Sequence, residues 1–246
     1  QLGEDKRGKQ YEQDLEKNSI YVVNKFHHES HRTGRCLVFI TPNSERTMGT
    51  YLGASEMLEF SMDFMDAVNN SKILFTEGYQ FTSDQNFKAF ISVLENTDPN
   101  VQLALSLSDP FVVSNFKSRF EDVFSKRIVD YVFCNKEEAI AMAGENFVEG
   151  LSRISKNFVV TDGANSSVIC EEGNISEIEA HAVKAIDSNG AGDIYAGSVL
   201  HKIVQGKNFR KACEFGNFAS SIIVQEKSPR LSVEGYKNLQ KQFEHL

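Results

Sequence analysis

The sequence predicts an α/β domain built on a mainly parallel sheet and preceded by a small antiparallel β segment. From about residue 55 onward, short β-favouring runs alternate with longer helix-compatible runs. Before that point, short β-favouring runs are separated by tight turns. The 246 residues, 41% of them hydrophobic, suffice for one large core. We therefore expect the end of a helix plus a β-strand lid at 1–54 and a single α/β core at 55–246.

The N-terminal part begins with a run rich in Lys, Glu and Gln, which predicts a helix over about 6–18. Short strands are then expected over 20–23, 36–41 and 46–51, separated by turns at 32–35 and 42–45. These strands carry few bulky residues on one face. That pattern fits a lid or a dimerising sheet better than a core sheet.

In the core, apolar runs that end at Gly, Asp-Pro or a polar residue are typical of buried strands, and amphipathic runs between them are typical of helices. The expected strands cover 72–78, 101–107, 129–134 and 157–161, followed by a hairpin of 167–170 with 175–181. The expected helices cover 56–69, 84–96, 111–127 (as one or two helices), 136–143, 191–204, 209–224 and 233–245. Ligands of such sheets bind beyond the carboxyl ends of the strands. The polar residues there are the candidates to inspect, Glu77, Asp109, Asn135, Thr161 and the stretch 187–193 among them.

Composition excludes several classes of function. A net charge of −8 argues against a dominant nucleic-acid surface. No apolar run approaches membrane-spanning length, and no secretory signal is visible. The four cysteines are scattered without a Cys-x-x-Cys pair, which indicates reduced thiols and a cytoplasmic protein. The histidines at 27, 28 and 31 have spacing that could suit a metal, but a solvated strand or loop is the preferred interpretation.

The stretch 187–193 reads Asp-Ser-Asn-Gly-Ala-Gly-Asp and separates an apolar run at 180–186 from the expected helix at 191–204. A strand, a glycine turn and a helix start together leave free N–H groups where the helix dipole favours an anion. Gly190 and Gly192 allow close backbone approach. Asp193 would repel a bound phosphate, and it is better explained as a base that takes a proton from an attacking hydroxyl.

Three further features have a structural and a functional interpretation each. Asn135 and Glu138 fit a helix capping box, or instead a phosphate contact and a carboxylate that orders hydrated Mg²⁺. Thr161-Asp162-Gly163 fits a turn, or instead a nucleotide contact. Arg46 fits a solvated charge, or instead a group that reaches a transferring phosphoryl.

These residues together resemble the ribokinase-like carbohydrate kinases of the PfkB family. The stretch 187–193 resembles the family signature Asp-Thr-x-Gly-Ala-Gly-Asp, with Ser188 in place of the usual Thr. Asn135-x-x-Glu138 matches the Asn-x-x-Glu motif, and 161–163 resembles the Thr-x-Gly nucleotide loop. Residues 3–8 resemble the Gly-x-Asp-x-x-Gly that precedes the lid strands. The resemblance covers nearly the whole chain and implies a three-layer α/β/α fold.

The resemblance also implies a role for each site residue. Asp193 would be the catalytic base, and the amides of Gly190, Ala191, Gly192 and Asp193 would form an anion hole for the γ-phosphoryl group. Glu138 would hold Mg²⁺ through water, and Asn135 would contact the phosphates of ATP.

The remaining roles concern the nucleotide and a monovalent cation. Thr161 and Gly163 would line the ATP site, Asn217 would lie near the adenine, and Arg46 would contact phosphate. Asp187 and Ser188 would supply oxygens to K⁺, although the later part of that loop, 227–230, departs from the common Gly-Ala form.

Within the family, segments 33–34, 40–48 and 52–55 look most like adenosine kinases and their bacterial relatives. The expected reaction is transfer of the γ-phosphoryl group of ATP to adenosine, giving AMP. A sugar kinase of the ribokinase or fructokinase type is one alternative, and an inactive fragment or a non-catalytic nucleotide-binding protein is another. The family's opening strand, its acceptor-binding aspartate and its Gly-Gly segment have no match here, so we expect a missing N-terminal segment that would carry most acceptor specificity. The expected partners are a small nucleoside or sugar, without nucleic acid or membrane, in a monomer or a homodimer formed through the lid.

Overall fold

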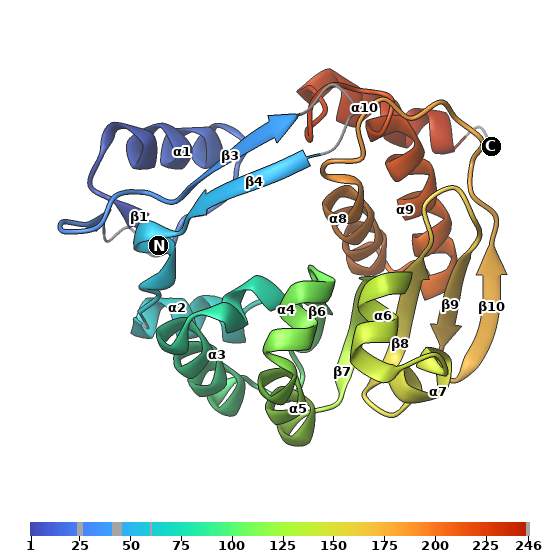
Figure 1. Cartoon of the computed structure of the whole chain (residues 1–246), viewed down its shortest axis with the longest axis horizontal. Coiled ribbons are helices and arrows are strands. Elements are labelled where there is room, and N and C mark those ends of the chain that lie inside the picture. Colours follow the sequence, from blue (N-terminus) through green and yellow to red (C-terminus); the bar gives the residue numbers. More distant parts are fainter. Residues whose placement is uncertain (24–26, 41–45, 60, 245–246) are drawn as a thin grey trace. The chain divides into compact units, whose positions relative to one another are not determined.

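The computed structural model in Figure 1 describes residues 1–23, 27–40, 46–59 and 61–244. Its internal contacts divide the chain into two compact units. The first unit consists of Gln1–Ser71 and Gln80–Val101. The second consists of Lys72–Tyr79 and Gln102–Leu246. The boundary that we expect after residue 54 lies inside the first unit.

The second unit is built on a six-stranded sheet with the order β10-β9-β8-β7-β6-β5. The strands that run parallel are β5 (Ile73–Glu77), β6 (Gln102–Ser106), β7 (Val129–Asn135) and β8 (Ser155–Thr161). The sheet ends in an antiparallel hairpin of β9 (Ser167–Glu171) and β10 (Asn174–Ile178), with β9 also antiparallel to β8. The predicted mainly parallel sheet with a terminal hairpin is therefore confirmed.

Helices cover both faces of this sheet. The helices α6 (Lys136–Ala143) and α7 (Phe147–Ser152) pack against β7 and β8, with α4 (Pro110–Asn115) against α6 and α5 (Lys117–Lys126) next to α4. The helices α8 (Ala191–Val204) and α9 (Phe209–Ile223) pack against β7, β9 and β10, and α10 (Val233–Phe243) packs on α9.

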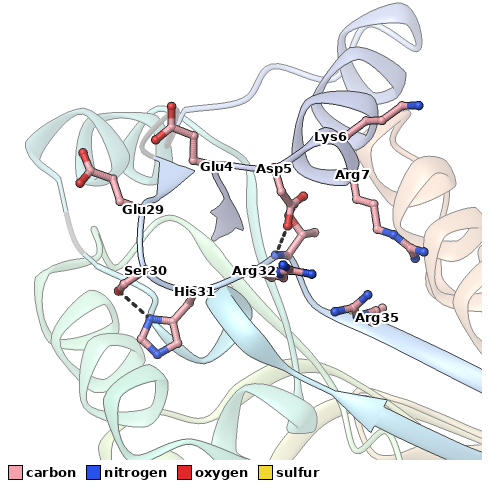
Figure 2. Close-up of a pocket in the computed structure, with 10 residues that line it drawn as sticks. Glu4, Asp5, Lys6, Arg7, Glu29, Ser30, His31, Arg32 and Arg35 are labelled. Atoms are coloured by element: carbon pink, nitrogen blue, oxygen red, sulfur yellow. Dashed lines mark hydrogen bonds between the residues drawn. The ribbon is translucent and has the colours of Figure 1, made fainter.

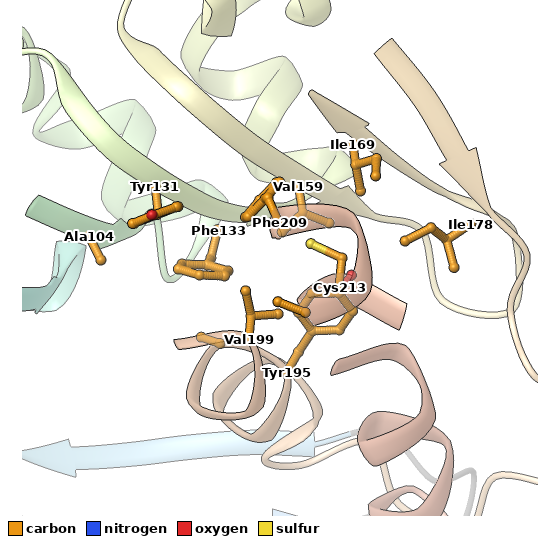
Figure 3. Packing of buried hydrophobic residues seen from close by; sticks show 12 residues of the cluster. Ala104, Tyr131, Phe133, Val159, Ile169, Ile178, Tyr195, Val199, Phe209 and Cys213 are labelled. Atoms are coloured by element: carbon orange, nitrogen blue, oxygen red, sulfur yellow. The ribbon is translucent and has the colours of Figure 1, made fainter. Parts of the chain in front are cut away.

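The main core lies between the sheet and the pair α8 and α9 (Figure 3). Tyr131 and Phe133 of β7 point into it, together with Val199 of α8 and Phe209 of α9. Because neighbouring strand residues point to opposite faces, Val132 and Cys134 point to the α6 side, where both are buried. The packing of α8 on α9 requires a glycine at one position, because a Cβ on Gly216 would come 2.8 Å from Cγ2 of Val199.

The described residues of the first unit form two small sheets. β1 (Leu2–Gly3) pairs in parallel with β2 (His27–His28), and β3 (Arg35–Ile40) pairs antiparallel with β4 (Arg46–Tyr51). Its α-helices are α1 (Lys6–Lys17), α2 (Met62–Asn69) and α3 (Asp84–Asn96), and a 3₁₀ turn covers Gly53–Glu56. A second 3₁₀ turn, Gly78–Thr82, begins in the second unit and ends in the first. The described part of the chain contains no helix long and apolar enough to cross a membrane.

Four local predictions are wrong. Segment 20–23 forms no strand, because the Ile20 amide donates instead to the Leu15 carbonyl at the end of α1 (2.9 Å). The helix expected from residue 56 begins at Met62. Segment 180–186, which we expect to form the strand before the glycine turn, has no regular structure. Its Ile186 amide donates to the Val224 carbonyl (2.7 Å) rather than to a neighbouring strand. The short helix α7 lies where no helix is expected from the sequence.

The late start of α2 has a non-local cause. The side chain of Asn86, on α3, accepts a hydrogen bond from the Leu58 amide (2.9 Å) and donates one to the Ser55 carbonyl (2.7 Å). These bonds hold the chain after the 3₁₀ turn out of a helical conformation. The side chain of Ser61 then caps the new helix by accepting from the Phe64 amide (3.1 Å).

Candidate functional site

The start of α8 carries the glycine-rich stretch. Gly190 occupies the N-cap position with a left-handed backbone (φ 78°) and has no side chain with which to cap the helix. The Ala191 amide bonds only at 3.3 Å to the Ser188 carbonyl. At Gly192 a Cβ would meet nothing within 4 Å, so the space beside this amide is open. Asp193 is exposed in the first turn. The helix start thus offers amide donors and an accessible carboxylate side by side.

Parallel pairing brings the other candidates to one edge of the sheet. In the register of β7 and β8, Asn135 lies directly opposite Thr161. At the same edge Glu77, the last residue of β5, lies opposite Ser106 of β6. These are the carboxyl ends of the strands, where α/β sheets place their ligands. The predicted convergence of polar residues beyond the strand ends is therefore present for Asn135 and Thr161.

Asn135 and Glu138 form a complete capping box at the start of α6. The Asn135 side chain accepts from the Glu138 amide (2.8 Å), and Glu138 Oε2 accepts from the Asn135 amide (3.1 Å). Asn135 Nδ2 also donates to Glu138 Oε1 (2.7 Å). Burial raises the pKa of Glu138 to about 7, with Asp109 and Glu137 adding to the effect against the lowering by the Asn135 amide. The structural interpretation of this motif is confirmed, and it leaves lone pairs on both carboxylate oxygens.

Electrostatic coupling shows that the start of α8 lies near the end of β5. The pKa of Glu77 is raised by burial and then by the nearby charge of Asp193. The pKa of Tyr79 is raised to about 12 by burial and by four surrounding carboxylates, those of Asp109, Glu138, Glu77 and Asp193. In the residues that the structure describes, no group of three or more His, Cys, Asp or Glu side chains is arranged to hold a metal ion.

Thr161 and Gly163 flank a turn that an ion pair holds in place. Thr161 ends β8 and donates from Oγ1 to the Cys134 carbonyl at 3.4 Å. Between them, Asp162 pairs with Lys136 at the start of α6 (Nζ to Oδ2, 3.0 Å). Gly163 has a left-handed backbone (φ 58°), and a Cβ there would meet nothing within 4 Å. This turn lies beside Asn135 with open space above its glycine.

The structure gives the positions of the remaining candidates, but in its described part they do not come together in one ligand site. Asn217, buried in α9, donates from Nδ2 to the Glu179 carbonyl (2.6 Å). Asp187 accepts from the Asn189 amide (3.0 Å) and from Asn189 Nδ2 (3.2 Å), and Ser188 beside it is exposed. Arg46 is the first residue of β4, and its side chain lies outside the described part of the structure.

Three residues beside the site carry no assigned role in the sequence analysis. In the sequence, Glu77 and Asp109 stand out only as polar residues at the ends of expected strands. Tyr79 was missed, because a tyrosine two residues past a strand carries no recognisable signal. Its Oη donates to the Ser108 carbonyl at 3.4 Å, which ties the ends of β5 and β6 together.

Comparisons with known proteins agree with this geometry. Residues 1–235 match the family model described as pfkB family carbohydrate kinase. Adenosine kinase 1 of Arabidopsis thaliana is 26% identical in an alignment 250 positions long, which covers 91% of this chain and 70% of that protein.

Two solved structures show the same ribokinase-like fold. The adenosine kinase of Sinorhizobium meliloti superposes with a TM-score of 0.85 at 26% identity, over 98% of this chain and 76% of that one. A Rhizobium etli protein described as a "probable sugar kinase" superposes with a TM-score of 0.87 at 26% identity and the same coverage. The predicted fold class and family are therefore confirmed, and the chain belongs to the pfkB family of carbohydrate kinases, which are phosphotransferases with an alcohol group as acceptor.

Proposed function

We propose that this protein transfers the γ-phosphoryl group of ATP to the primary hydroxyl of a nucleoside, with adenosine giving AMP as the first choice of acceptor. The observation that carries the proposal is the start of α8, where the exposed Asp193 carboxylate stands beside uncapped amides with open space at Gly192. The named adenosine kinases among the relatives and solved structures support the choice of acceptor.

The residues present fit ATP and Mg²⁺. The amides of 191–193 offer donors that no N-cap side chain occupies, as an oxyanion of the transferring phosphoryl group requires. The carboxylate of Glu138 accepts hydrogen bonds from Asn135, and its remaining lone pairs can accept from the hydrogens of metal-bound water. Mg²⁺ commonly needs only one or two carboxylates besides water and phosphate oxygens. When bound, the ion neutralises charge on the phosphates of ATP.

The chain's own residues then have distinct tasks. Asp193 accepts the proton of the acceptor hydroxyl as that oxygen attacks. The amides of Gly190, Ala191, Gly192 and Asp193 hold the negative charge that develops on the transferred group. Asn135 contacts the phosphates, and Thr161 and Gly163 line the nucleotide site at the neighbouring strand end.

Three finer assignments complete the proposal. Asn217 lies near the adenine, Arg46 contacts a phosphate, and Asp187 with Ser188 supplies oxygens to K⁺. The free cysteines support a cytoplasmic location. A monomer, or a homodimer formed through the β3–β4 hairpin, remains the proposed assembly.

The test is the turnover of the Asp193→Asn variant with ATP, Mg²⁺ and adenosine. We expect a loss of at least about a hundredfold, the usual contribution of a positioned base. The exposed Asp122→Asn variant on α5 makes the same charge change away from the site and should keep wild-type turnover. Near-wild-type turnover of a folded Asp193→Asn protein would refute the role of Asp193 as base.

A sugar kinase is the second candidate function. It is favoured by the Rhizobium etli structure, whose identity to this chain equals that of the adenosine kinase structure. Labelled ATP with a panel of adenosine, other nucleosides, ribose and fructose separates the two. A kcat/KM for either sugar above that for adenosine would overturn the choice of adenosine and leave the assignment of Asp193 intact.

A further inference from the structure

A pocket of about 440 Å³ lies wholly within the first unit, far along the sequence from the residues assigned to phosphoryl transfer. It is formed by the turn from β1 into α1 and by the segment that leads into β3. Its lining residues are all charged or polar: Glu4, Asp5, Lys6, Arg7, Glu29, Ser30, His31, Arg32, Thr33 and Arg35. A pocket with such a lining suits a small charged ligand, because charged side chains form strong hydrogen bonds with charged groups.

Three arginines gather on one side of this pocket. Figure 2 shows the guanidinium groups of Arg7, Arg32 and Arg35 on the same side of Asp5, with Glu4 and Glu29 on the other side. Neither the side chain of Arg7 nor that of Arg32 makes a hydrogen bond or an ion pair with another described residue. Arg35 lies over the ring of Tyr51, 5.5 Å from its centre. The fork of donors on each of these guanidinium groups is therefore still available.

These guanidinium groups lack a carboxylate partner among the described residues, although the protein is rich in acidic residues. The protein has 34 acidic residues against 26 lysines and arginines, so carboxylate partners are plentiful. The carboxylate of Asp5, which lines the same pocket, is already used by other donors. Its oxygens accept from the Gly8 amide (2.9 Å), the Thr33 amide (2.8 Å) and the Thr33 hydroxyl (2.9 Å).

The same bonds fix the backbone that carries the arginines. Asp5 joins the start of α1 to Thr33, and the Gly3 amide donates to Thr33 Oγ1 (3.1 Å). On the other side, the Ala54 amide donates to the Arg32 carbonyl (2.9 Å). Arg7, Arg32 and Arg35 thus extend from a backbone that is held before any ligand arrives, which lowers the entropic cost of binding.

We propose that this pocket binds the phosphate group of a small molecule through the guanidinium groups of Arg7, Arg32 and Arg35. Tetrahedral phosphate oxygens match the paired donors of arginine, and several guanidinium groups can share one phosphate. The proposal is independent of the proposed reaction, since none of these residues belongs to the phosphoryl-transfer machinery. The ligand is either inorganic phosphate or a phosphomonoester.

The test is calorimetric titration of the full chain with inorganic phosphate and with glycerol 3-phosphate, at constant ionic strength set with chloride. The Arg7→Gln/Arg32→Gln double variant should bind both probes at least about tenfold more weakly. A matched control, Lys9→Gln/Lys17→Gln, makes the same charge change outside the pocket, on the helix α1 that also carries Arg7, and should stay within about twofold of the wild type.

Two further variants distinguish specific binding of phosphate by the arginines from the effects of unfolding and of net charge. Arg32→Lys keeps the charge but loses the paired donors, so its affinity should fall between those of the wild type and the double variant. Glu4→Gln/Glu29→Gln removes two negative charges that line the pocket and should tighten binding. Equal melting temperatures without phosphate show that each variant is folded.

Tighter binding of glycerol 3-phosphate identifies a phosphomonoester as the ligand, and equal or tighter binding of inorganic phosphate identifies the free anion. The proposal is overturned if neither probe binds saturably. It is equally overturned if the arginine double variant binds as the wild type does, or if the lysine control loses as much affinity as the arginine variant.

Discussion

The α-carbon of Gly190 lies directly against the backbone of Pro229. A Cβ built on Gly190 would come 2.6 Å from the Pro229 carbonyl oxygen, and the backbone of Gly190 is left-handed with φ 78°. Two independent reasons therefore require glycine at this position. The loop that departs from the common family form, 227–230, thus supports the start of α8 through its proline.

We expect Gly190→Ala to lower the free energy of unfolding by about 1–3 kcal/mol, the usual cost of a strained backbone position with a steric clash. Turnover should fall further than the loss of folded protein explains, because α8 must shift to relieve the contact with Pro229. Chemical denaturation and a kinase assay on the same samples measure the two effects. Unchanged stability would show that the contact with Pro229 does not form in solution.

Gly192→Ala is the matched variant two residues later. Its Cβ would meet nothing within 4 Å, so stability should stay the same or rise by up to about 1 kcal/mol, as for other replacements of glycine in a helix. Turnover should nevertheless fall, because the methyl group occupies the space that we assign to the transferred phosphoryl group. Full turnover in this variant would contradict that assignment.

Glu138 allows the capping role and the metal role to be separated. Its folded-state pKa of about 7 lies above its ordinary value of 4.5, so the folded protein binds the proton more tightly. The free energy of unfolding should therefore fall as pH rises from about 4.5 to 7. Glu138→Gln keeps a capping acceptor without the buried charge, so it should be more stable than the wild type at pH 8 and equal to it near pH 4.

Glu138→Ala, in contrast, removes the capping partner as well as the buried charge, so it should be less stable than Glu138→Gln by about 1 kcal/mol at both pH values. If Glu138 holds hydrated Mg²⁺, both variants should lose turnover and respond less to Mg²⁺. Titration of activity with Mg²⁺, together with melting curves at the two pH values, separates the metal role from the capping role. A Glu138→Gln protein with wild-type turnover and Mg²⁺ response would leave only the capping role.

Asp5 makes the first unit sensitive to acid. The amides of Gly8 and Thr33 lower its pKa from 3.8 to about 2, so its charged form stabilises the folded protein above about pH 4. That contribution should be lost as pH falls from about 4 to 2. Asp5→Asn keeps an N-cap acceptor without the charge. This variant should be less stable than the wild type at pH 7, and the difference, measured by denaturation, should shrink as pH falls from about 4 to 2. A difference that does not change with pH would refute the mechanism.

Elements with local signals could be predicted from the sequence. The helix α3 has the predicted bounds, because Ser83 caps its first turn and its apolar residues recur at helical spacing. The helix α8 also has the predicted bounds, because Gly190 precedes it and the run 191–204 is compatible with a helix. In both cases the information lies within the element itself.

Features that depend on distant residues could not be predicted. The start of α2 depends on Asn86, which lies 28 residues beyond the amide of Leu58 that it holds. The contact between Gly190 and Pro229 and the coupling of Glu77 to Asp193 likewise join segments far apart in the sequence. The motif predicts Asp193 and the amides at the start of α8 as site candidates, whereas the proximity of Glu77 to Asp193 emerges only from the fold.

The coupling of Glu77 to Asp193 gives a test of the site that does not depend on activity. The charge of Asp193 raises the pKa of Glu77, in addition to the larger effect of burial. Asp193→Asn removes that charge while keeping the shape of the side chain, so the pKa of Glu77 should fall towards its ordinary value. Carboxyl ¹³C chemical shifts of labelled glutamate, followed over pH, measure this change, and Asp122→Asn on α5 should leave it untouched. A Glu77 pKa that is the same in Asp193→Asn and in the wild type would mean that the start of α8 does not lie near the end of β5, and the proposed site would lose its geometric basis even if the variant were inactive.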